Sequence, residues 1–344
     1  MNRRVMVALS GGVDSSVCVH LLKEQGYDVS GVVLKMSPAH ADTVAAAEDA
    51  AAALGIPLFV KDMEEAFERL VVDYFMAEYK AGRTPNPCIR CNPTVKFRAL
   101  LETAEEQGCH WIATGHYAGL ERRGGVTFLK KAGCLKRDQS YMLYRLGQDV
   151  LSRLILPLAS MEKNEVRAAA ERLGLSCANK PDSQEICFIP DNDYAGFIER
   201  RLGSSPAGDF ISPDGVSCGR HRGILHYTVG QRKGLGIALG EPVFIREIDP
   251  ADNCIYLARA GGDLISKVYL EDFTVPTGLP LPAHFTAGVK LRSVAQPVEA
   301  AVERKGEHAT VTLKEPYRVV AKGQSAVLYD GDTVLGGGII AGSE

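Results

Sequence analysis

Short apolar runs alternate with helical stripes in the N-terminal part of the chain. The runs cover residues 5–9, 29–34, 58–60 and 111–113. Between them, Val13, Val17 and Leu21 share one helical face, and residues 63–79 carry a second stripe formed by Phe67, Leu70, Val71, Tyr74 and Phe75. Strands that alternate with amphipathic helices predict an α/β fold with a parallel sheet. We expect both stripes to lie in the core.

The pattern changes near residue 203. A stretch rich in glycine, serine and proline at 203–208 ends the helical pattern, and short strands separated by turn residues follow it. A hairpin is predicted over 243–257, and a second break follows at 260–263. Apolar runs at 285–291, 298–304, 309–313 and 325–329 then predict a small antiparallel β-barrel. We therefore divide the chain into domains 1–203, 204–262 and 263–344.

A glycine loop, SGGVDSS at 10–16, lies between the first predicted strand and the first predicted helix. Such a loop brings backbone N–H groups and the positive end of a helix to one point, which suits phosphate oxygens. It lacks the lysine of a Walker loop and the spacing of a dinucleotide loop. Asp14 could hold a Mg²⁺ ion that bridges to phosphate. An ordinary strand-to-helix turn is the alternative.

The composition is that of a globular protein. Of 344 residues, 46% are hydrophobic and 24% are charged, and the net charge of −3 gives no overall basic character for binding nucleic acid. Residues 200–240 hold six basic side chains against two acidic ones, which suits either a solvated face or a polyanion. The chain starts directly with the first strand and has no membrane-length apolar segment, so we expect a cytoplasmic location without membrane contact.

Nine cysteines without regular spacing argue against a secreted disulfide framework. Cys88 and Cys91 form a C-x-x-C pair, and Asn92-Pro93 is predicted to supply the N-cap and first position of the next helix. Cys91 would then lie just before a helix N-terminus, where the thiolate is favoured. The helix dipole contributes about 0.3–1 kcal/mol, less than the ~1.36 kcal/mol of one pKa unit, so full activation needs another positive neighbour or a metal.

Other interpretations of the cysteines are open at this point. A zinc site would need a second C-x-x-C pair, which the chain lacks, and a redox pair would need a more helical approach than Pro85 and Pro87 allow. Cys187 lies in the apolar segment 186–190, where a cysteine is ordinarily a core residue.

Six motifs then occur in a fixed order along nearly the whole chain. They are SGGVDSS at 10–16, GRTPNPCIRCN at 82–92 with Lys96-Phe97, ATGHY at 113–117, DQSY at 138–141, DSQEICFI at 182–189 and YTVGQRKGLG at 227–236. Each motif is weak alone, but the ordered set is specific and resembles the bacterial tRNA-specific 2-thiouridylases. The glycine loop resembles the pyrophosphate loop of the ATP pyrophosphatases.

The resemblance implies a sulfurtransferase with ATP and Mg²⁺ as cofactors. ATP would adenylate the C2 oxygen of uridine 34, the wobble base, in tRNAs for Lys, Glu and Gln, and sulfur would then displace AMP to give 2-thiouridine. A base inside a stacked anticodon must be extruded before this chemistry can begin. The sulfur donor would be a cysteine desulfurase or a relay protein. Domain 1–203 would be catalytic, 204–262 a small basic central domain, and 263–344 a tRNA-binding barrel.

The same resemblance assigns roles to residues. Cys187 would carry sulfur as a persulfide and Cys91 would be the nucleophile that releases it, which leaves a Cys91–Cys187 disulfide. Three further sets are implied: for ATP, Ala8, Leu9, Ser10, Gly11, Gly12, Val13, Asp14, Ser15, Leu34 and Gly115; for the target base, Asn86, Pro87 and Cys88; and for tRNA, His116, Arg137, Asp138, Gln139, Arg292, Ser293 and Gln324.

Cys88 stands where some relatives carry aspartate. A thiol here raises the hypothesis that Cys88, Cys91 and Cys187 hold three irons of a [4Fe-4S] cluster and leave the fourth iron free for sulfide. Two other functions are also open. A ligase or amidotransferase for a small molecule would explain the glycine loop but not the cysteines, and a non-catalytic RNA-binding protein would explain the barrel but not the loop.

Overall fold

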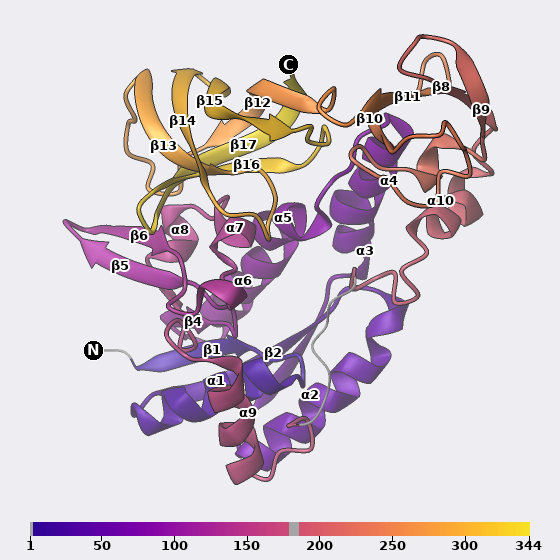
Figure 1. Cartoon of the computed structure of the whole chain (residues 1–344). Coiled ribbons are helices and arrows are strands. Elements are labelled where there is room, and N and C mark those ends of the chain that lie inside the picture. Colours follow the sequence, from indigo (N-terminus) through magenta and orange to yellow (C-terminus); the bar gives the residue numbers. More distant parts are fainter. Residues whose placement is uncertain (1–2, 179–185) are drawn as a thin grey trace.

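A five-stranded parallel sheet lies at the centre of the N-terminal part of the computed structural model, which describes residues 3–178 and 186–344 (Figure 1). Its strands are β1 (Arg4–Ala8), β2 (Asp28–Lys35), β3 (Leu58–Asp62), β4 (Trp111–Ala113) and β7 (Leu154–Ile155), in the order β3-β2-β1-β4-β7. The four predicted strands and their parallel pairing are confirmed. Strand β7 was not predicted, because two residues are too few to show a pattern.

Different helices cover the two faces of this sheet. Val5 and Val7 of β1 pack in one cluster with α1 (Val13–Glu24) and α2 (Ala41–Leu54), whereas Met6 packs with α6 (Phe97–Glu106) on the other face. Successive residues of a strand point to opposite faces, which is why a continuous apolar run suits a strand buried on both sides. The strand order reverses at β1, so its carboxyl end is the topological switch point, where open α/β sheets bind ligands.

The second predicted stripe forms one helical stretch. It runs through α3 (Glu64–Phe67), a π-helical turn (Glu68–Val72) and α4 (Asp73–Lys80). Phe67 and Phe75 are buried in a cluster that also contains Cys91 and Phe188. The rings of Phe67 and Phe75 lie 5.5 and 5.4 Å from that of Phe188, both in edge-to-face contact. The stripe therefore packs in the core, as expected. It contacts Phe188, the residue that follows Cys187.

A β-hairpin that the apolar pattern does not predict lies beneath the barrel (Figure 1). Strands β5 (Gly119–Arg123) and β6 (Val126–Lys130) are joined by Gly124 and Gly125, with φ of 58° and 78°. Two consecutive positive φ angles are typical of the type I′ hairpin turn, so the Gly-Gly step was the available signal. Strand β6 pairs with the barrel strand β17 at Lys130 and Thr333, which joins the hairpin to the barrel sheet.

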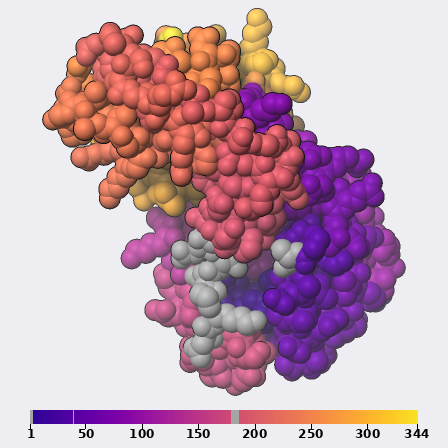
Figure 2. Space-filling view, turned by 90° about the vertical axis from the view of Figure 1, so that its right-hand side faces the viewer, coloured from indigo at the N-terminus to yellow at the C-terminus, as the bar shows by residue number. Residues whose placement is uncertain are grey.

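The middle of the chain forms a smaller unit. Its elements are α10 (Tyr194–Leu202), β8 (Gly208–Ile211), β9 (Ser217–His221), β10 (Val243–Asp249) and β11 (Cys254–Arg259), and the strand order is β10-β11-β8-β9. The predicted hairpin is confirmed as the antiparallel pair β10–β11. In Figure 2 this unit, salmon to orange, lies above the indigo and purple N-terminal part.

The C-terminal part is a closed antiparallel barrel, as the apolar runs predict. Its strands are β12 (Leu264–Thr274), β13 (His284–Lys290), β14 (Val298–Lys305), β15 (His308–Arg318), β16 (Ser325–Asp330) and β17 (Thr333–Ser343). Pairing of β12 with both β15 and β17 closes the barrel and leaves no free edge among these strands. None of the helices in the described ranges is both long and apolar enough to cross a membrane.

Four helices complete the N-terminal part: α5 (Pro87–Cys91), α7 (Ser140–Leu143), α8 (Gln148–Leu151) and α9 (Lys163–Arg172). Helix α7 attaches the barrel. The hydroxyl group of Tyr141 donates to the carbonyl oxygen of Ser325 at 2.8 Å, and the hydroxyl oxygens of Ser140 and Tyr329 lie 3.1 Å apart. All four residues are buried, so these hydrogen bonds hold α7 against strand β16.

Replacing Phe75 should loosen the cluster beside Cys187. The change Phe75→Ala leaves a cavity at a fully buried ring and should lower the free energy of unfolding by about 3–5 kcal/mol. Urea unfolding followed by the fluorescence of Trp111, the chain's one tryptophan, measures this loss in the N-terminal part. Phe285→Ala, at a half-buried position of the barrel, is the control. Equal losses in the two variants would contradict the assignment of Phe75 to this core.

Candidate functional site

The glycine loop lies at the switch point of the sheet, between β1 and α1. Gly11 has φ of 67°, and a Cβ atom there would lie 2.4 Å from the backbone carbonyl carbon of Ala46 in α2. Gly12 is the N-cap of α1 and supplies no side-chain cap to the first-turn amides. Ser15 donates from its hydroxyl group to the carbonyl oxygen of Gly12 at 3.1 Å and accepts from the amide of Ser10 at 3.2 Å. The loop is therefore closed on itself, with a helix N-terminus available for an anion.

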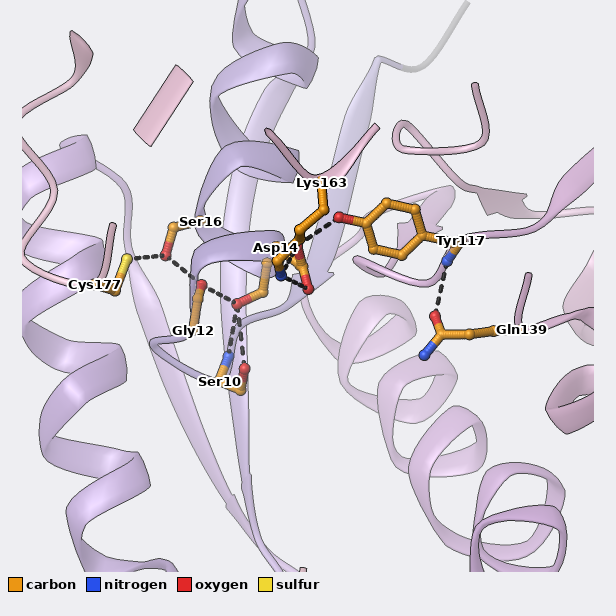
Figure 3. A network of polar contacts seen from close by, with 9 residues as sticks. Ser10, Gly12, Asp14, Ser16, Tyr117, Gln139, Lys163 and Cys177 are labelled. Atoms are coloured by element: carbon orange, nitrogen blue, oxygen red, sulfur yellow. Dashed lines mark hydrogen bonds and ion pairs between the residues drawn. The ribbon is translucent and has the colours of Figure 1, made fainter. Parts of the chain in front are cut away.

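Asp14, in the first turn of α1, is held from two other segments (Figure 3). The ammonium group of Lys163, at the start of α9, lies 2.8 Å from each carboxylate oxygen. The hydroxyl group of Tyr117 donates to Oδ1 at 2.7 Å. The Lys163 side chain is only 8% exposed, whereas that of Asp14 is 32% exposed, so the carboxylate keeps one open side. Carboxylate oxygens with an open side suit Mg²⁺, which keeps several waters when it binds.

The segment 113–117 packs directly on this turn. A Cβ atom at Gly115 would lie 2.9 Å from the backbone carbonyl carbon of Asp14, so only glycine allows this approach. Tyr117 is fixed in turn by Gln139, whose side-chain oxygen accepts from the Tyr117 amide at 2.8 Å (Figure 3). The Gln139 amide also donates to the Tyr117 carbonyl oxygen at 2.8 Å. The structure thus brings together two residues predicted for ATP and one predicted for tRNA.

The helix after the C-x-x-C pair does not begin where the sequence predicted. Asn86 is the N-cap, with its side-chain oxygen accepting from the Cys88 amide at 3.1 Å, and Pro87 is the first helical residue. The helix continues through a π-helical turn (Asn92–Lys96) into α6. The prediction that Asn92-Pro93 opens the helix is therefore wrong. The chain has two Asn-Pro steps, the first one starts the helix, and the wider turn accommodates the second proline.

This correction changes the electrostatics of Cys91. The residue lies at the end of the first helical turns, not before a helix N-terminus, and it is buried. Burial raises the pKa of its thiol to about 11, while the positive charge of Lys96 opposes this increase. The expected stabilisation of a Cys91 thiolate by the helix dipole is therefore not found. The sequence predicted that activation of Cys91 would need another positive neighbour, and Lys96 is such a residue.

Cys187 lies in the same environment. Burial and the nearby thiols of Cys88 and Cys91 raise its pKa to about 12, and Lys96 again acts in the opposite direction. Its residue surface is nevertheless exposed. The next residue, Phe188, is buried in the cluster that also contains Cys91. The three thiols predicted for sulfur chemistry are thus close enough to influence one another.

All three are free thiols, and no disulfide joins Cys91 to Cys187 in the described structure. Among residues 3–178 and 186–344, no group of three or more His, Cys, Asp or Glu side chains is arranged to hold a metal ion. As placed here, Cys88, Cys91 and Cys187 therefore do not form a ready cluster site.

The residues predicted for tRNA differ in their accessibility. Asp138 has a side chain only 3% exposed; it accepts from the amides of Ala132 and Ser140 and pairs with Lys290 of the barrel at 3.6 Å. The ring of His116 stacks on Phe97 at 5.8 Å, and burial, with a smaller effect of Lys96, lowers its pKa to about 3. Both side chains thus have partners within the protein, and neutral His116 offers no charge to a phosphate.

The other predicted tRNA residues lie at the barrel edge or near it. Arg137 and Arg292 are exposed and Ser293 is half-buried. Arg292 donates to the carbonyl oxygen of Val319 at 3.3 Å and approaches Gly230 of the YTVGQRKGLG motif. Gln324 donates from its side chain to the carbonyl oxygen of Thr84 at 2.7 Å, beside the Asn86 loop. The barrel therefore contacts the segment that carries the predicted target-base residues.

Two contributors to this site received no role from the sequence, although one of them, Tyr117, lies in the ATGHY motif. Lys163 and Tyr117 lie 149 and 103 positions from Asp14, so only the folded chain brings them together. A lysine at the first position of a helix was the available signal for Lys163, since the helix dipole disfavours a cation there.

Three family models match the chain in succession. Residues 3–191 match the tRNA methyl transferase HUP domain, 195–259 the tRNA methyl transferase PRC-barrel domain, and 268–340 the aminomethyltransferase beta-barrel domain.

The tRNA-specific 2-thiouridylase MnmA of Clostridioides difficile is 43% identical over 356 residues, covering 99% of this chain and 98% of the relative. The protein of the same name from Carboxydothermus hydrogenoformans is 42% identical over 355 residues, covering 98% and 97%. Among solved structures, the U34-tRNA thiolase NcsA from Methanococcus maripaludis with its [4Fe-4S] cluster shares 21% identity at a TM-score of 0.38, covering 58% of this chain and 67% of that one.

A methyl group at Gly11 should damage the loop. Gly11→Ala adds a clash with Ala46 to the backbone strain of a positive φ and should lower ATP affinity more than tenfold. Gly124→Ala is the matched control, because its φ of 58° carries the same strain of about 1–2 kcal/mol while its Cβ would meet nothing within 4 Å. Calorimetric titration with ATP and urea unfolding measure the two effects. An ATP affinity in Gly11→Ala equal to that of Gly124→Ala would exclude the loop as the ATP site.

Proposed function

The chain belongs to the tRNA-specific 2-thiouridylases, and from this membership we propose that it converts uridine 34 of tRNAs for Lys, Glu and Gln to 2-thiouridine. The observation that carries the proposal is that a phosphate-binding loop and a group of thiols lie in the same N-terminal unit. A glycine loop for ATP lies at the switch point of the sheet, and three thiols that influence one another lie around the helix that starts at Pro87.

The first half of the reaction is activation. The C2 oxygen of uracil attacks the α-phosphorus of ATP, pyrophosphate leaves, and the oxygen becomes part of a good leaving group, AMP. We assign ATP to residues 8–15, the backbone at Leu34, and Gly115. The amides at the start of α1 favour the phosphate charges. Asp14 would hold Mg²⁺, which neutralises phosphate charge when bound.

The second half is sulfur transfer. A donor places sulfur on Cys187 as a persulfide, and the Cys91 thiolate attacks the inner sulfur. A Cys91–Cys187 disulfide forms, hydrosulfide is released to attack C2, and AMP departs with the C–O electron pair. A dithiol then reduces the disulfide. The raised pKa values of both thiols support a resting state in which they are protonated. The donor is a cysteine desulfurase or a relay protein.

The remaining assignments concern recognition. The extruded base would face Asn86, Pro87 and Cys88. These residues form the start of α5, and the Cys88 thiol is exposed there. Arg137, Gln139, Arg292, Ser293 and Gln324 are assigned to tRNA, together with the 200–240 basic segment. His116 and Asp138 are assigned to the same tRNA surface, where their contacts within the protein would also position these residues. The divisions 1–203, 204–262 and 263–344 are kept as catalytic, central and tRNA-binding domains.

A [4Fe-4S] cluster on Cys88, Cys91 and Cys187 is the alternative sulfur carrier. Their mutual effect on pKa values favours it, whereas their arrangement among the described residues does not fit a metal site. We therefore route no step through a cluster. Methyl transfer, the activity in the family-model descriptions, would leave both the glycine loop and the thiols without a role.

Removal of the proposed sulfur carriers should separate the two half-reactions. Cys91→Ser and Cys187→Ser should each lower 2-thiouridine formation at least 1000-fold and keep tRNA-dependent pyrophosphate release, whereas Asp14→Ala should block both. Purified protein, ATP, a cysteine desulfurase with cysteine as the persulfide source, and tRNA with or without uridine 34 supply the assay, and nucleoside mass spectrometry supplies the readout. Cys109→Ser, at a buried thiol away from this group, is the control. AMP release without any thionucleoside would favour a small-molecule ligase instead.

Anaerobic purification distinguishes the two sulfur carriers. Iron-free protein that thiolates tRNA at the full rate is expected from the persulfide route. About four irons per chain, lost together with activity in Cys88→Ser, would replace that route by the cluster.

A further inference from the structure

A buried lysine faces the glycine loop across one carboxylate. Lys163 is 7% exposed, and its ammonium group lies 2.8 Å from both oxygens of Asp14. In Figure 3 its side chain points from α9 toward the first turn of α1. Asp14 belongs to that first turn, so its side chain alone separates the ammonium group from the loop where phosphates would bind.

The position of Lys163 is unfavourable unless it serves another purpose. It is the first residue of α9, where the helix dipole repels a cation. Its backbone is fixed by a capping box, in which the Glu162 amide donates to Glu165 at 2.7 Å and the Glu162 side chain accepts from the N3 amide in return. The main chain therefore cannot move far, but the four-carbon side chain can rotate about its own bonds.

A second observation concerns the loop itself. SGGVDSS has no lysine, although a loop of this kind must balance the charge that develops on pyrophosphate. A Walker loop solves this problem with a lysine inside the loop. Here a lysine reaches the same first turn from a helix 149 positions away.

We propose that Lys163 is a catalytic residue of the adenylation step, which supplies the phosphate-binding ammonium group that the glycine loop lacks. The inference rests on the proposed function, because it assigns a role within that ATP site. In the absence of nucleotide, Lys163 balances Asp14. When ATP binds, the ammonium group moves from Asp14 to an oxygen of the β-phosphate, and Asp14 becomes available to a cation.

The charge balance of the step is simple. The uracil C2 oxygen forms a bond to the α-phosphorus as the N3 proton of the ring leaves to water, and the bond from that phosphorus to the bridging oxygen breaks. The electron pair leaves with pyrophosphate, and the Lys163 ammonium group stabilises it by hydrogen bonding while keeping all its protons. No oxidant, reductant or further acid is required.

Inorganic pyrophosphate without Mg²⁺ tests this contact apart from turnover. Lys163→Met should weaken pyrophosphate binding about 10- to 100-fold in calorimetric titrations, the loss of a hydrogen bond to a charged group. AMP affinity should stay within about twofold, since AMP lacks the β-phosphate. Lys163→Arg keeps the charge and should recover part of the affinity. Lys130→Met, which removes a lysine held by Glu121 and Asp332 far from the loop, should bind pyrophosphate as the wild type does.

A double variant separates contact from simple charge balance. Asp14→Asn with Lys163→Met restores the wild-type net charge of the pair, so a lysine that only balances Asp14 predicts wild-type pyrophosphate affinity. A direct contact predicts an affinity about tenfold or more below wild type. Wild-type affinity in the double variant overturns the inference. Thermal unfolding and AMP binding check that each variant is folded, and a wild-type protein that binds neither ATP nor pyrophosphate would instead overturn the proposed ATP site.

Discussion

The carboxylate of Asp14 joins three segments of the chain on which the rest of the N-terminal site depends. It belongs to α1, accepts from Tyr117 after β4, and pairs with Lys163 at the start of α9. A buried lysine without an anion would be strongly destabilising, so this pairing supports the packing of α9, which also buries Val166 against Val13 and Val17 of α1. Tyr117 in turn carries the two hydrogen bonds to Gln139. One negative charge at the switch point thus contacts the glycine loop, the 113–117 segment and α9 together.

Burial keeps the thiols of Cys91 and Cys187 uncharged, in contrast to the charged pair of Asp14 and Lys163. With a pKa of about 11, only about one Cys91 side chain in 10⁴ is a thiolate at pH 7. A nucleophile that is protonated at rest does not consume a persulfide before the uridine has been activated. Lys96 is the group near both thiols that acts to lower their pKa values. The proposed order, activation first and sulfur second, therefore agrees with the electrostatics of the resting site, because reactivity requires a change in the surroundings of Cys91.

The elements that follow from local apolar periodicity were predicted from the sequence. The features that depend on a choice between two similar local signals, or on residues far apart in the chain, were not. The strands β1 to β4, the stripe through Phe75 and the barrel follow from apolar patterns that the core imposes. The helix start at Asn86 was misplaced because two Asn-Pro steps satisfy the same local rule, and only packing decides between them. Lys163 was missed because its partner lies 149 residues away. The ion pair of Asp138 with Lys290 could not be predicted either, because the two residues lie in different parts of the chain.

The barrel and the N-terminal part are joined by buried hydrogen bonds, an ion pair and one strand pairing. Tyr141 and Ser140 bond to β16, Lys290 pairs with Asp138, and β17 continues into the hairpin through Lys130. The segment 138–141 therefore contacts the barrel on one side and Tyr117, beside Asp14, on the other. A surface that is already assembled does not spend binding energy on ordering itself when RNA arrives. That energy remains for unstacking the wobble base, which is the step that a rigid anticodon makes costly. In the proposed reaction the phosphate site and the sulfur site both lie in the N-terminal part, so these contacts set where tRNA held by the barrel presents its wobble base to them.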